Sequence, residues 1–256
     1  MIHPTAIVSD SAKIGNNVAI GAYSIVEDNV ILGDNNVIKS HVTINSGTNI
    51  GDGNTFYPFS TIGEQSQDKL DDGCDTYLVI GDNNVFREHC AIHRGTAKEH
   101  KVTKIGSDNL IMSHCHVAHD CVLGDNIIMA SYSALAGHVR VDNYAIIGGG
   151  SLVHQYCSIG AYSMSAIGTV ILKDVPAYIM VCGNAARERG MNYEGMRRRG
   201  YTSDQISELR QAYRIAYRSS YTVLDALKKL YEFGKTNERI KLFADSIKHS
   251  KRGITR

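Results

Sequence analysis

The chain has 256 residues, of which 43% are hydrophobic and 21% are charged, the composition of an ordinary soluble globular protein. Its 27 basic and 26 acidic side chains give a formal net charge of +1, which excludes the global field of a typical nucleic-acid or membrane binder. Any charged partner must therefore be met by a local patch.

The N-terminus has neither the basic nor the apolar segment of a signal peptide, and no apolar run is long enough to span a bilayer. The six cysteines form no C-x-x-C pair, so neither a zinc ribbon nor a disulfide framework is indicated. We expect a cytoplasmic protein with no membrane span, no nucleic-acid partner, no bound metal and no cofactor.

From the N-terminus onward, large apolar residues recur every six positions. The first run is Val8, Ile14, Ile20, Val26, Leu32, Ile38, Ile44, Ile50, Phe56 and Ile62. The same phase returns at Ile80 and again at Ile105, and it continues to Ile159. Ser165 breaks the pattern and Ile171 restores it. Glycine or another small or polar residue often follows the apolar position, which is typical of turns.

A period of six predicts a short strand and a turn in each unit, with one side chain pointing inward. Three units would close a triangular coil of about eighteen residues, and coils would stack at the spacing of neighbouring strands. The segments 66–77 and 94–104 interrupt the period and are polar and charged. We expect both to be loops on one side of the solenoid, where binding sites are often found.

The period changes at about residue 187. Apolar residues then recur at helical spacing after Thr202, and Thr202 with Gln205 predicts a capping box. A second helix is expected from Thr222, with Val223, Leu227, Leu230 and Tyr231 on its apolar face, and a third around Ile240, Phe243 and Ile247. The chain is therefore expected to end as a small helical domain.

Several histidines occupy positions of the repeat that do not point inward. His119 and His138 are nineteen residues apart, so they should lie on adjacent coils, and Asp120 follows His119. An imidazole held by a carboxylate is suited to take a proton from a hydroxyl. Gly137 could bring a backbone N–H close to a developing oxyanion. These residue types together predict acyl-transfer chemistry.

The hexapeptide pattern resembles that of the hexapeptide-repeat acyltransferase superfamily. Within it, one family has similar short segments in the same order, the UDP-N-acetylglucosamine O-acyltransferases that open lipid A synthesis in Gram-negative bacteria. The similar segments of the repeat are residues 92–96 (IHRGT), 106–110 (GSDNL), 116–121 (HVAHDC), 135–139 (LAGHV) and 153–155 (VHQ). Those of the tail are residues 174–176 (DVP), 183–184 (GN), 191–195 (MNYEG) and 197–200 (RRRG). The resemblance runs from end to end of the chain.

This resemblance implies a left-handed parallel β-helix over residues 1–186, with the two loops inserted, and an α-helical domain over residues 187–256. It also implies a homotrimer with its sites between subunits. The reaction would move a (3-hydroxy)acyl group from acyl carrier protein to the 3-hydroxyl of UDP-N-acetylglucosamine by direct attack. A basic patch, with Arg210, Arg214 and Arg218 among its residues, is expected to dock the acidic carrier protein.

The resemblance also assigns roles to single residues. His119 would be the general base, Asp120 would orient it, and Gly137 would stabilise the oxyanion. The substrate-binding residues would be Asp68, His93, His116, His138, His154, Gln155, Asn192, Glu194, Arg198 and Arg199. Guanidinium groups suit a diphosphate geometrically.

Two places depart from the family pattern. Relatives usually have Gln-Asp-Leu-Lys in the first loop, whereas this chain has Gln67-Asp68-Lys69-Leu70, so the lysine that would approach the donor is displaced by one position. Ile167, followed by Gly168, lies where the family measures acyl chain length. The bulk of Ile167 predicts a preference for shorter acyl groups than glycine-bearing relatives accept.

Other readings remain open from the sequence. The spacing of His114 and His119 resembles zinc-dependent carbonic anhydrases of the same fold, although a third ligand would fall near Leu78. A non-catalytic hexapeptide scaffold would not need the His119 cluster. A related family that acylates the amine of UDP-glucosamine normally carries a further N-terminal domain, for which no room is left before Val8. An acceptor with a 3-amino group in place of the 3-hydroxyl remains possible.

Overall fold

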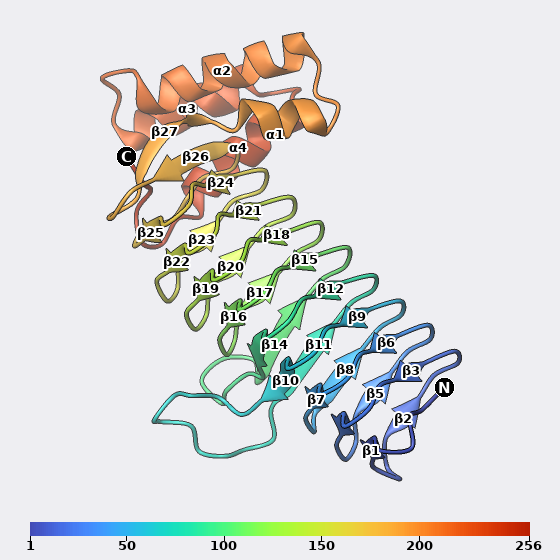
Figure 1. The fold of residues 1–256 in the computed structure, drawn as a ribbon. Coiled ribbons are helices and arrows are strands. Elements are labelled where there is room, and N and C mark those ends of the chain that lie inside the picture. The colour runs from blue at the N-terminus through green and yellow to red at the C-terminus, as the bar shows by residue number, and fades with distance from the viewer.

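The computed structural model describes residues 1–256 and contains the expected left-handed parallel β-helix followed by helices (Figure 1). The coils advance from the N-terminus at one end, and the helices cover the other end. None of the helices is long and apolar enough to cross a membrane.

Three parallel sheets form the sides of the prism. The first sheet consists of β1 (Ile7–Val8), β4 (Ile25–Val26), β7 (Thr43–Ile44), β10 (Thr61–Glu64), β13 (Ala91–His93), β16 (His116–Val117), β19 (Ala134–Leu135), β22 (Leu152–Val153) and β25 (Val170–Ile171). The second consists of β2 (Lys13–Ile14), β5 (Ile31–Leu32), β8 (Thr48–Ile50), β11 (Tyr77–Ile80), β14 (Val102–Ile105), β17 (Val122–Leu123), β20 (Arg140–Val141) and β23 (Ser158–Ile159).

The third sheet has ten strands, of which the last two are antiparallel to each other. They are β3 (Ala19–Ile20), β6 (Val37–Ile38), β9 (Thr55–Phe56), β12 (Val85–Phe86), β15 (Leu110–Ile111), β18 (Ile128–Met129), β21 (Ile146–Ile147), β24 (Met164–Ser165), β26 (Ile179–Cys182) and β27 (Arg187–Met191).

The pairing register confirms the predicted repeat. Val8 pairs with Val26 one coil later, and Ile62 pairs with Ile92 across the first loop. The inward residue of each strand is buried almost throughout, so a single column of apolar side chains fills the prism. Ser165, the exception, is buried and its hydroxyl accepts a hydrogen bond from the Gly148 N–H at 2.9 Å. Its polar group is therefore satisfied inside the core.

The turns between the second and third sheets, which we call the asparagine edge, contain a ladder of buried amides. The side-chain oxygen of Asn36 accepts from the Asn54 N–H, that of Asn54 from Asn84, and that of Asn84 from Asn109, at 2.8 to 3.0 Å. Larger residues would not fit at the glycine positions of this edge, because a Cβ at Gly33 would lie 2.2 Å from Asp52 Oδ1. Each coil thus binds the next through side chains as well as strands.

The turns between the third and first sheets form the aromatic edge, where six rings stack on successive coils. They are Tyr23, His41, Phe59, His89, His114 and Tyr132, with neighbouring centroids 4.6 to 5.2 Å apart. All six residues have positive φ angles near 60°. The rings of Tyr23, Phe59 and Tyr132 are more than half exposed, so this edge presents an apolar stripe.

Both inserted loops lie between the first and second sheets, on what we call the loop edge (Figure 1). The first loop spans residues 65–76, which is the predicted length shifted by one position. The second spans residues 94–101 and is shorter than predicted, because β14 begins at Val102 and pairs with β11. The prediction that both loops emerge on one side is confirmed.

The helices are α1 (Tyr193–Arg198), α2 (Ser203–Tyr217), α3 (Val223–Phe233) and α4 (Glu238–Lys248). The capping box of Thr202 and Gln205 is present at the start of α2. Val223 was expected on the buried face of α3 but is 38% exposed, since it is the first residue of the helix and precedes its packed turns. Residues 187–191, the start of the proposed second domain, form β27 and extend the third sheet.

The last residues of the chain return to the β-helix and bind Asp174. The buried Asp174 carboxylate accepts hydrogen bonds from the Ser158 N–H at 2.8 Å, the Ser250 hydroxyl at 2.7 Å, and the N–H groups of Lys251 and Arg252 at 2.9 and 3.1 Å. A bridge between Asp174 and Ile254 continues the second sheet. The tail therefore covers the open end of that sheet.

Candidate active site

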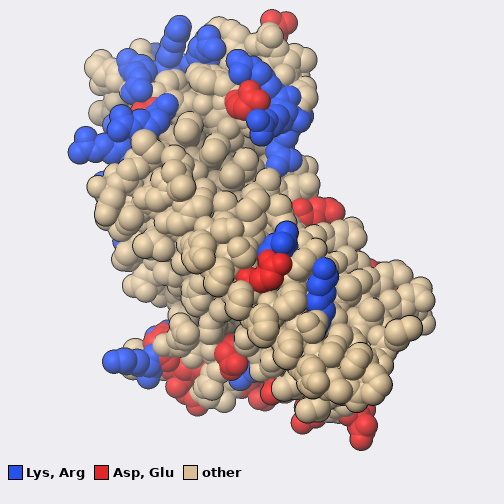
Figure 2. Space-filling view, in the orientation of Figure 1, with Lys and Arg blue, Asp and Glu red and all other residues tan.

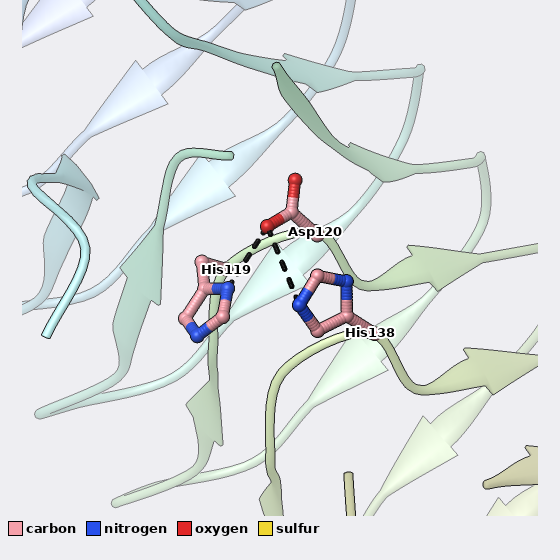
Figure 3. Close-up of side chains that lie close together, drawn as sticks. All are labelled: His119, Asp120 and His138. Atoms are coloured by element: carbon pink, nitrogen blue, oxygen red, sulfur yellow. Dashed lines mark hydrogen bonds and ion pairs between the residues drawn. The ribbon is translucent and has the colours of Figure 1, made fainter. Parts of the chain in front are cut away.

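The candidate site lies on the loop edge, where two successive turns bring His119, Asp120 and His138 together (Figure 3). His119 and Asp120 follow β16, and His138 follows β19, which pairs with β16. The two imidazole centroids are 5.1 Å apart with an interplanar angle of 88°. The prediction from the nineteen-residue spacing is confirmed.

His119 and Asp120 form a hydrogen-bonded pair. His119 Nδ1 donates to Asp120 Oδ2 at 2.9 Å, and the carboxylate is buried while the imidazole is partly exposed. With the proton on Nδ1, the other ring nitrogen, Nε2, is an unprotonated acceptor. The pair can therefore accept a proton from a hydroxyl placed beside Nε2.

The pKa of Asp120 is lowered despite its burial. Burial alone raises the pKa, but hydrogen bonds from His119 and from the hydroxyl and N–H of Thr96 outweigh it. The carboxylate therefore stays charged at neutral pH and can stabilise the imidazolium that forms when His119 takes a proton.

Gly137 lies directly against the imidazole of His119. A Cβ at this position would lie 2.5 Å from Cε1 and 2.7 Å from Nε2 of His119, so only glycine fits. The Gly137 carbonyl accepts from the Tyr156 N–H, whereas the Gly137 N–H makes no hydrogen bond within the chain. A free backbone donor thus lies beside His119, and a donor of this kind can stabilise an oxyanion.

His138 is buried beside the pair. Its ring stacks on Tyr156 with centroids 4.3 Å apart, Nε2 lies 3.9 Å from Asp120 Oδ2, and Nδ1 lies 3.6 Å from a carboxylate oxygen of Glu99. No hydrogen-bond partner satisfies Nδ1 within the chain. The ring is held mainly by packing, which leaves it able to bind a substrate atom.

His93 and His116 extend the cluster toward the first loop. Their centroids are 5.0 Å apart, and His93 Nδ1 is bonded to the Gln65 carbonyl at 2.7 Å. Burial, and then the neighbouring His93 and His119, lower the pKa of His116 to about 4. His116 is therefore neutral at working pH and can act only as a polar contact.

Asp68, on the first loop, is ion-paired with Lys98 on the second. The hydrogen bond from Lys98 is the main cause of a lowered pKa at Asp68, and His119 also lowers it. Asp68 therefore lies within electrostatic reach of His119. Lys69 and Gln67 are exposed beside it, and the ammonium that meets Asp68 comes from Lys98 rather than from Lys69.

His154 and Gln155 lie one coil further along the loop edge, after β22, and both side chains are exposed. His154 Nδ1 is bonded to the Gln155 carbonyl at 3.1 Å. They continue the row of polar side chains that starts at His119.

Four of the expected substrate-binding residues lie on a different edge of the same chain, namely Asn192, Glu194, Arg198 and Arg199. The Asn192 amide donates to the Tyr162 carbonyl at 3.0 Å, and the Arg199 guanidinium lies 4.3 Å from the ring of Tyr144. Tyr144 and Tyr162 are turn residues of the asparagine edge. Glu194 is paired with Arg198 nearby on α1. One chain therefore does not bring this group to His119.

Ile167 and Gly168 lie on the third edge. They are in the turn between β24 and β25, on the aromatic edge, and Ile167 is 84% exposed while Gly168 has a φ of +67°. The ruler position and the base are thus separated by a full side of the prism within one chain.

Sequence reasoning gave no role to three residues of the second loop that the structure brings to the cluster: Thr96, Lys98 and Glu99. Thr96 belongs to a segment that supported the family resemblance, but no periodicity predicts its contact with Asp120 across an irregular loop.

The nitrogen or oxygen atoms of His119, Asp120 and His138 lie within 4.8 Å of one another and could hold a metal ion. A cation here would have to displace the Nδ1 proton that His119 shares with Asp120. The zinc site suggested by the spacing of His114 and His119 is not formed. His114 stacks between His89 and Tyr132 on the aromatic edge, and Leu78, at the expected position of a third ligand, is fully buried.

The chain matches known proteins over its whole length. The family model described as "Udp N-acetylglucosamine O-acyltransferase; Domain 2" matches residues 174–255, and the bacterial transferase hexapeptide model (six repeats) matches residues 11–46 and 103–137. The acyl-[acyl-carrier-protein]–UDP-N-acetylglucosamine O-acyltransferase of Ectopseudomonas mendocina is 51% identical over 255 residues, covering 100% of this chain and 99% of the relative. That of Pseudomonas paraeruginosa is 50% identical over 256 residues, with the same coverage.

Two solved structures of similar proteins have the same fold over the whole chain. The UDP-N-acetylglucosamine O-acyltransferase (LpxA) of Moraxella catarrhalis superposes with a TM-score of 0.97 at 46% identity, covering 100% of this chain and 99% of the other. LpxA from Acinetobacter baumannii gives a TM-score of 0.97 at 43% identity and the same coverage.

Proposed function

The chain belongs to the UDP-N-acetylglucosamine O-acyltransferase family, and we propose that it catalyses the first step of lipid A biosynthesis in the cytoplasm. In this reaction a (3-hydroxy)acyl group moves from acyl carrier protein to the 3-hydroxyl of UDP-N-acetylglucosamine. The observation that carries the proposal is the His119–Asp120 pair with the free N–H of Gly137 against its imidazole. These are the base and the oxyanion donor that a direct acyl transfer needs.

In the proposed mechanism, Nε2 of His119 takes the proton from the sugar 3-hydroxyl as its oxygen attacks the thioester carbonyl carbon. Asp120 stabilises the imidazolium, and the Gly137 N–H donates to the oxyanion of the tetrahedral intermediate. Collapse of the intermediate breaks the C–S bond, and the leaving sulfur takes the proton back from His119. The products are the sugar ester and the free thiol of the carrier protein.

The proposed site is shared between chains. His119 lies on the loop edge and Arg199 lies at the asparagine edge, so one site can contain both only if two copies contribute. A closed homotrimer would place the loop edge of each copy beside the asparagine edge of the next. The exposed rings of the aromatic edge would then be covered at the centre, which accounts for an apolar stripe on the isolated chain.

In that arrangement Asn192, Glu194, Arg198 and Arg199 would bind the uridine diphosphate end of the acceptor. Gln155 of the adjacent copy would contact the same end. The sugar and donor cleft would be lined by further residues of that copy, namely Asp68, His93, His116, His138 and His154. Arg198 is paired with Glu194 at 3.0 Å in the free chain, and the diphosphate would compete for it.

The carrier protein is proposed to dock on the helical domain. Residues 192–256 contain 15 basic and 7 acidic side chains, a net charge of +8, whereas residues 1–191 contain 12 basic and 19 acidic ones, a net charge of −7. Figure 2 shows Lys and Arg gathered over the helical end. Such a field attracts an acidic partner and orients it toward the site.

The proposal is tested by mass spectrometry of UDP-N-acetylglucosamine incubated with the protein and a series of 3-hydroxyacyl carrier proteins. The expected product is an ester on the sugar, which mild alkali removes. An alkali-stable product formed only with a 3-amino analogue would replace the hydroxyl acceptor by an amine. A folded trimer that acylates neither acceptor would overturn the proposal.

Ile167→Ala is expected to move the preferred donor toward acyl chains about two to four carbons longer, because each buried methylene changes binding by about 1–3 kcal/mol. The measurement is kcat/KM across the donor series. Ile31→Ala, which removes an exposed isoleucine from the second sheet, is the matched control and should leave the chain-length preference unchanged. If Ile167→Ala has the same acyl chain-length preference as the wild type, Ile167 does not set that preference.

A further inference from the structure

The second loop contacts the catalytic pair through one buried side chain. We infer that Thr96 is a positioning residue, whose hydroxyl and N–H fix the Asp120 carboxylate so that a single oxygen faces His119. The inference rests on the proposed role of His119 as the base. It gives the second loop a part in the reaction rather than in substrate contact alone.

Three distances carry this inference. The Thr96 hydroxyl donates to Asp120 Oδ2 at 2.6 Å, and the Thr96 N–H donates to Oδ1 at 3.0 Å. His119 Nδ1 donates to the same Oδ2 at 2.9 Å. Thr96 is 1% exposed and Asp120 is 3% exposed, so water does not replace these bonds. Both oxygens of the carboxylate are therefore held by one residue.

This arrangement fixes both the direction and the charge of Asp120. The Thr96 N–H holds Oδ1, and the Thr96 hydroxyl holds Oδ2 independently of the imidazole. Without the hydroxyl, Oδ2 would be bonded only to His119, the group that it has to orient. The Thr96 hydroxyl also competes with the imidazole for electron density on Oδ2. It thereby limits how strongly Asp120 stabilises a protonated His119.

The path of the loop is adapted to this contact. Gly95 precedes Thr96, and a Cβ on Gly95 would lie 2.2 Å from the Val102 N atom, so the loop needs glycine to pass this close to its own return. At the other end of the loop, the hydroxyl of Thr103 accepts from the Asp120 N–H at 2.8 Å. Two threonines thus hold Asp120, one by its side chain and one by its backbone.

Thr96→Val tests the inference, because it keeps the shape and the N–H and removes only the hydroxyl. We expect kcat at neutral pH to fall about tenfold with an unchanged KM for the sugar nucleotide. We also expect the acid limb of the kcat/KM profile to move to higher pH by about half a unit to one unit, since Asp120 then stabilises the imidazolium more. Thr96→Ser, which restores the hydroxyl, should return both quantities toward wild type.

Thr103→Val is the matched control. It removes a buried hydroxyl that holds the Asp120 backbone, so it should lower thermal stability without moving the acid limb. The other titratable groups facing His119, namely Asp68, His116 and His138, are retained in all these variants. A shift confined to Thr96→Val therefore reports on the carboxylate.

Nuclear magnetic resonance of the His119 ring in the substrate-free trimer provides a readout that does not need activity. The signal of the Nδ1 proton that is shared with Asp120 is expected to shift in Thr96→Val, and an unchanged signal with wild-type kcat overturns the inference. If His119→Ala keeps wild-type activity, the proposed role of His119 as the base fails instead, and if the wild type transfers no acyl group, the proposed function fails. These failures are thus distinguished.

Discussion

His119→Ala is expected to reduce acyl transfer by about 10²- to 10⁴-fold, the contribution typical of a positioned general base. The imidazole is bonded to the buried Asp120 through Nδ1, which leaves Nε2 unprotonated, and Figure 3 shows this nitrogen pointing away from the carboxylate. The measurement is kcat with saturating donor and acceptor. Equal secondary structure and equal trimer content by light scattering would show that the protein is still folded.

The pH dependence of activity should not come from His116. A general base needs an unprotonated nitrogen, so activity is expected to fall as the pH decreases. His116 cannot cause this fall above about pH 5, because burial, with His93 and His119, lowers its pKa to about 4. Two results would agree with this assignment. The pH profile should be unchanged in His116→Gln, and the fall in activity at low pH should be absent from the residual activity of His119→Ala.

His119→Ala also allows a test of the shared site. Arg199→Ala should remove a proposed substrate contact from the asparagine edge, whereas His119→Ala changes the loop edge. Each variant alone should therefore have low activity. In trimers assembled from equal amounts of the two, about a quarter of the sites should combine an intact loop edge with an intact asparagine edge and regain activity. Mixing His119→Ala with Asp120→Ala should restore nothing, since neither copy has an intact pair. No recovery in the first mixture would argue that one chain supplies the whole site.

Asp174→Ala should destabilise the protein by about 2–3 kcal/mol, because it leaves three backbone N–H groups without the buried carboxylate that accepts their hydrogen bonds. Those groups belong to Ser158, Lys251 and Arg252, from the β-helix and from the tail. The measurement is denaturant unfolding at fixed protein concentration, since assembly also contributes to stability. Residues 250–255 should become susceptible to proteolysis at the same time.

Asp10→Ala provides the matched control for Asp174→Ala. Asp10 lies in the turn between β1 and β2 of the same β-helix, and its side chain is exposed and accepts no hydrogen bond. Its removal should change the unfolding free energy by less than about 0.5 kcal/mol. A similar small loss in Asp174→Ala would show that the tail does not depend on this carboxylate.

The repeat could be predicted from the sequence because each strand contributes one inward side chain, so the apolar positions carry the register directly. Ile62 and Ile92 kept their phase across the first loop, and the buried Ser165 was recognised as an exception because its neighbours kept the period. Helix α1, of six residues, was missed because it is shorter than two turns and has no apolar period.

The contact between His119 and His138 could also be predicted, since coil stacking brings residues about one coil apart next to each other. Thr96 could not, because its distance from Asp120 depends on the path of an irregular loop. The sequence likewise did not reveal that Arg199 and His119 occupy different edges, since that follows from how the helical domain turns back over the prism.

The partners of Asp174 come from residues 250–252, about 76 positions later in the chain. A ribosome makes the coils first and delivers these residues last, so the nascent β-helix has an uncovered final coil while the helices are still being synthesised. Unpaired strand edges invite pairing with other chains. Synthesis that stalls or ends before residue 250 would therefore release a chain whose solenoid is largely complete but whose end is open to aggregation.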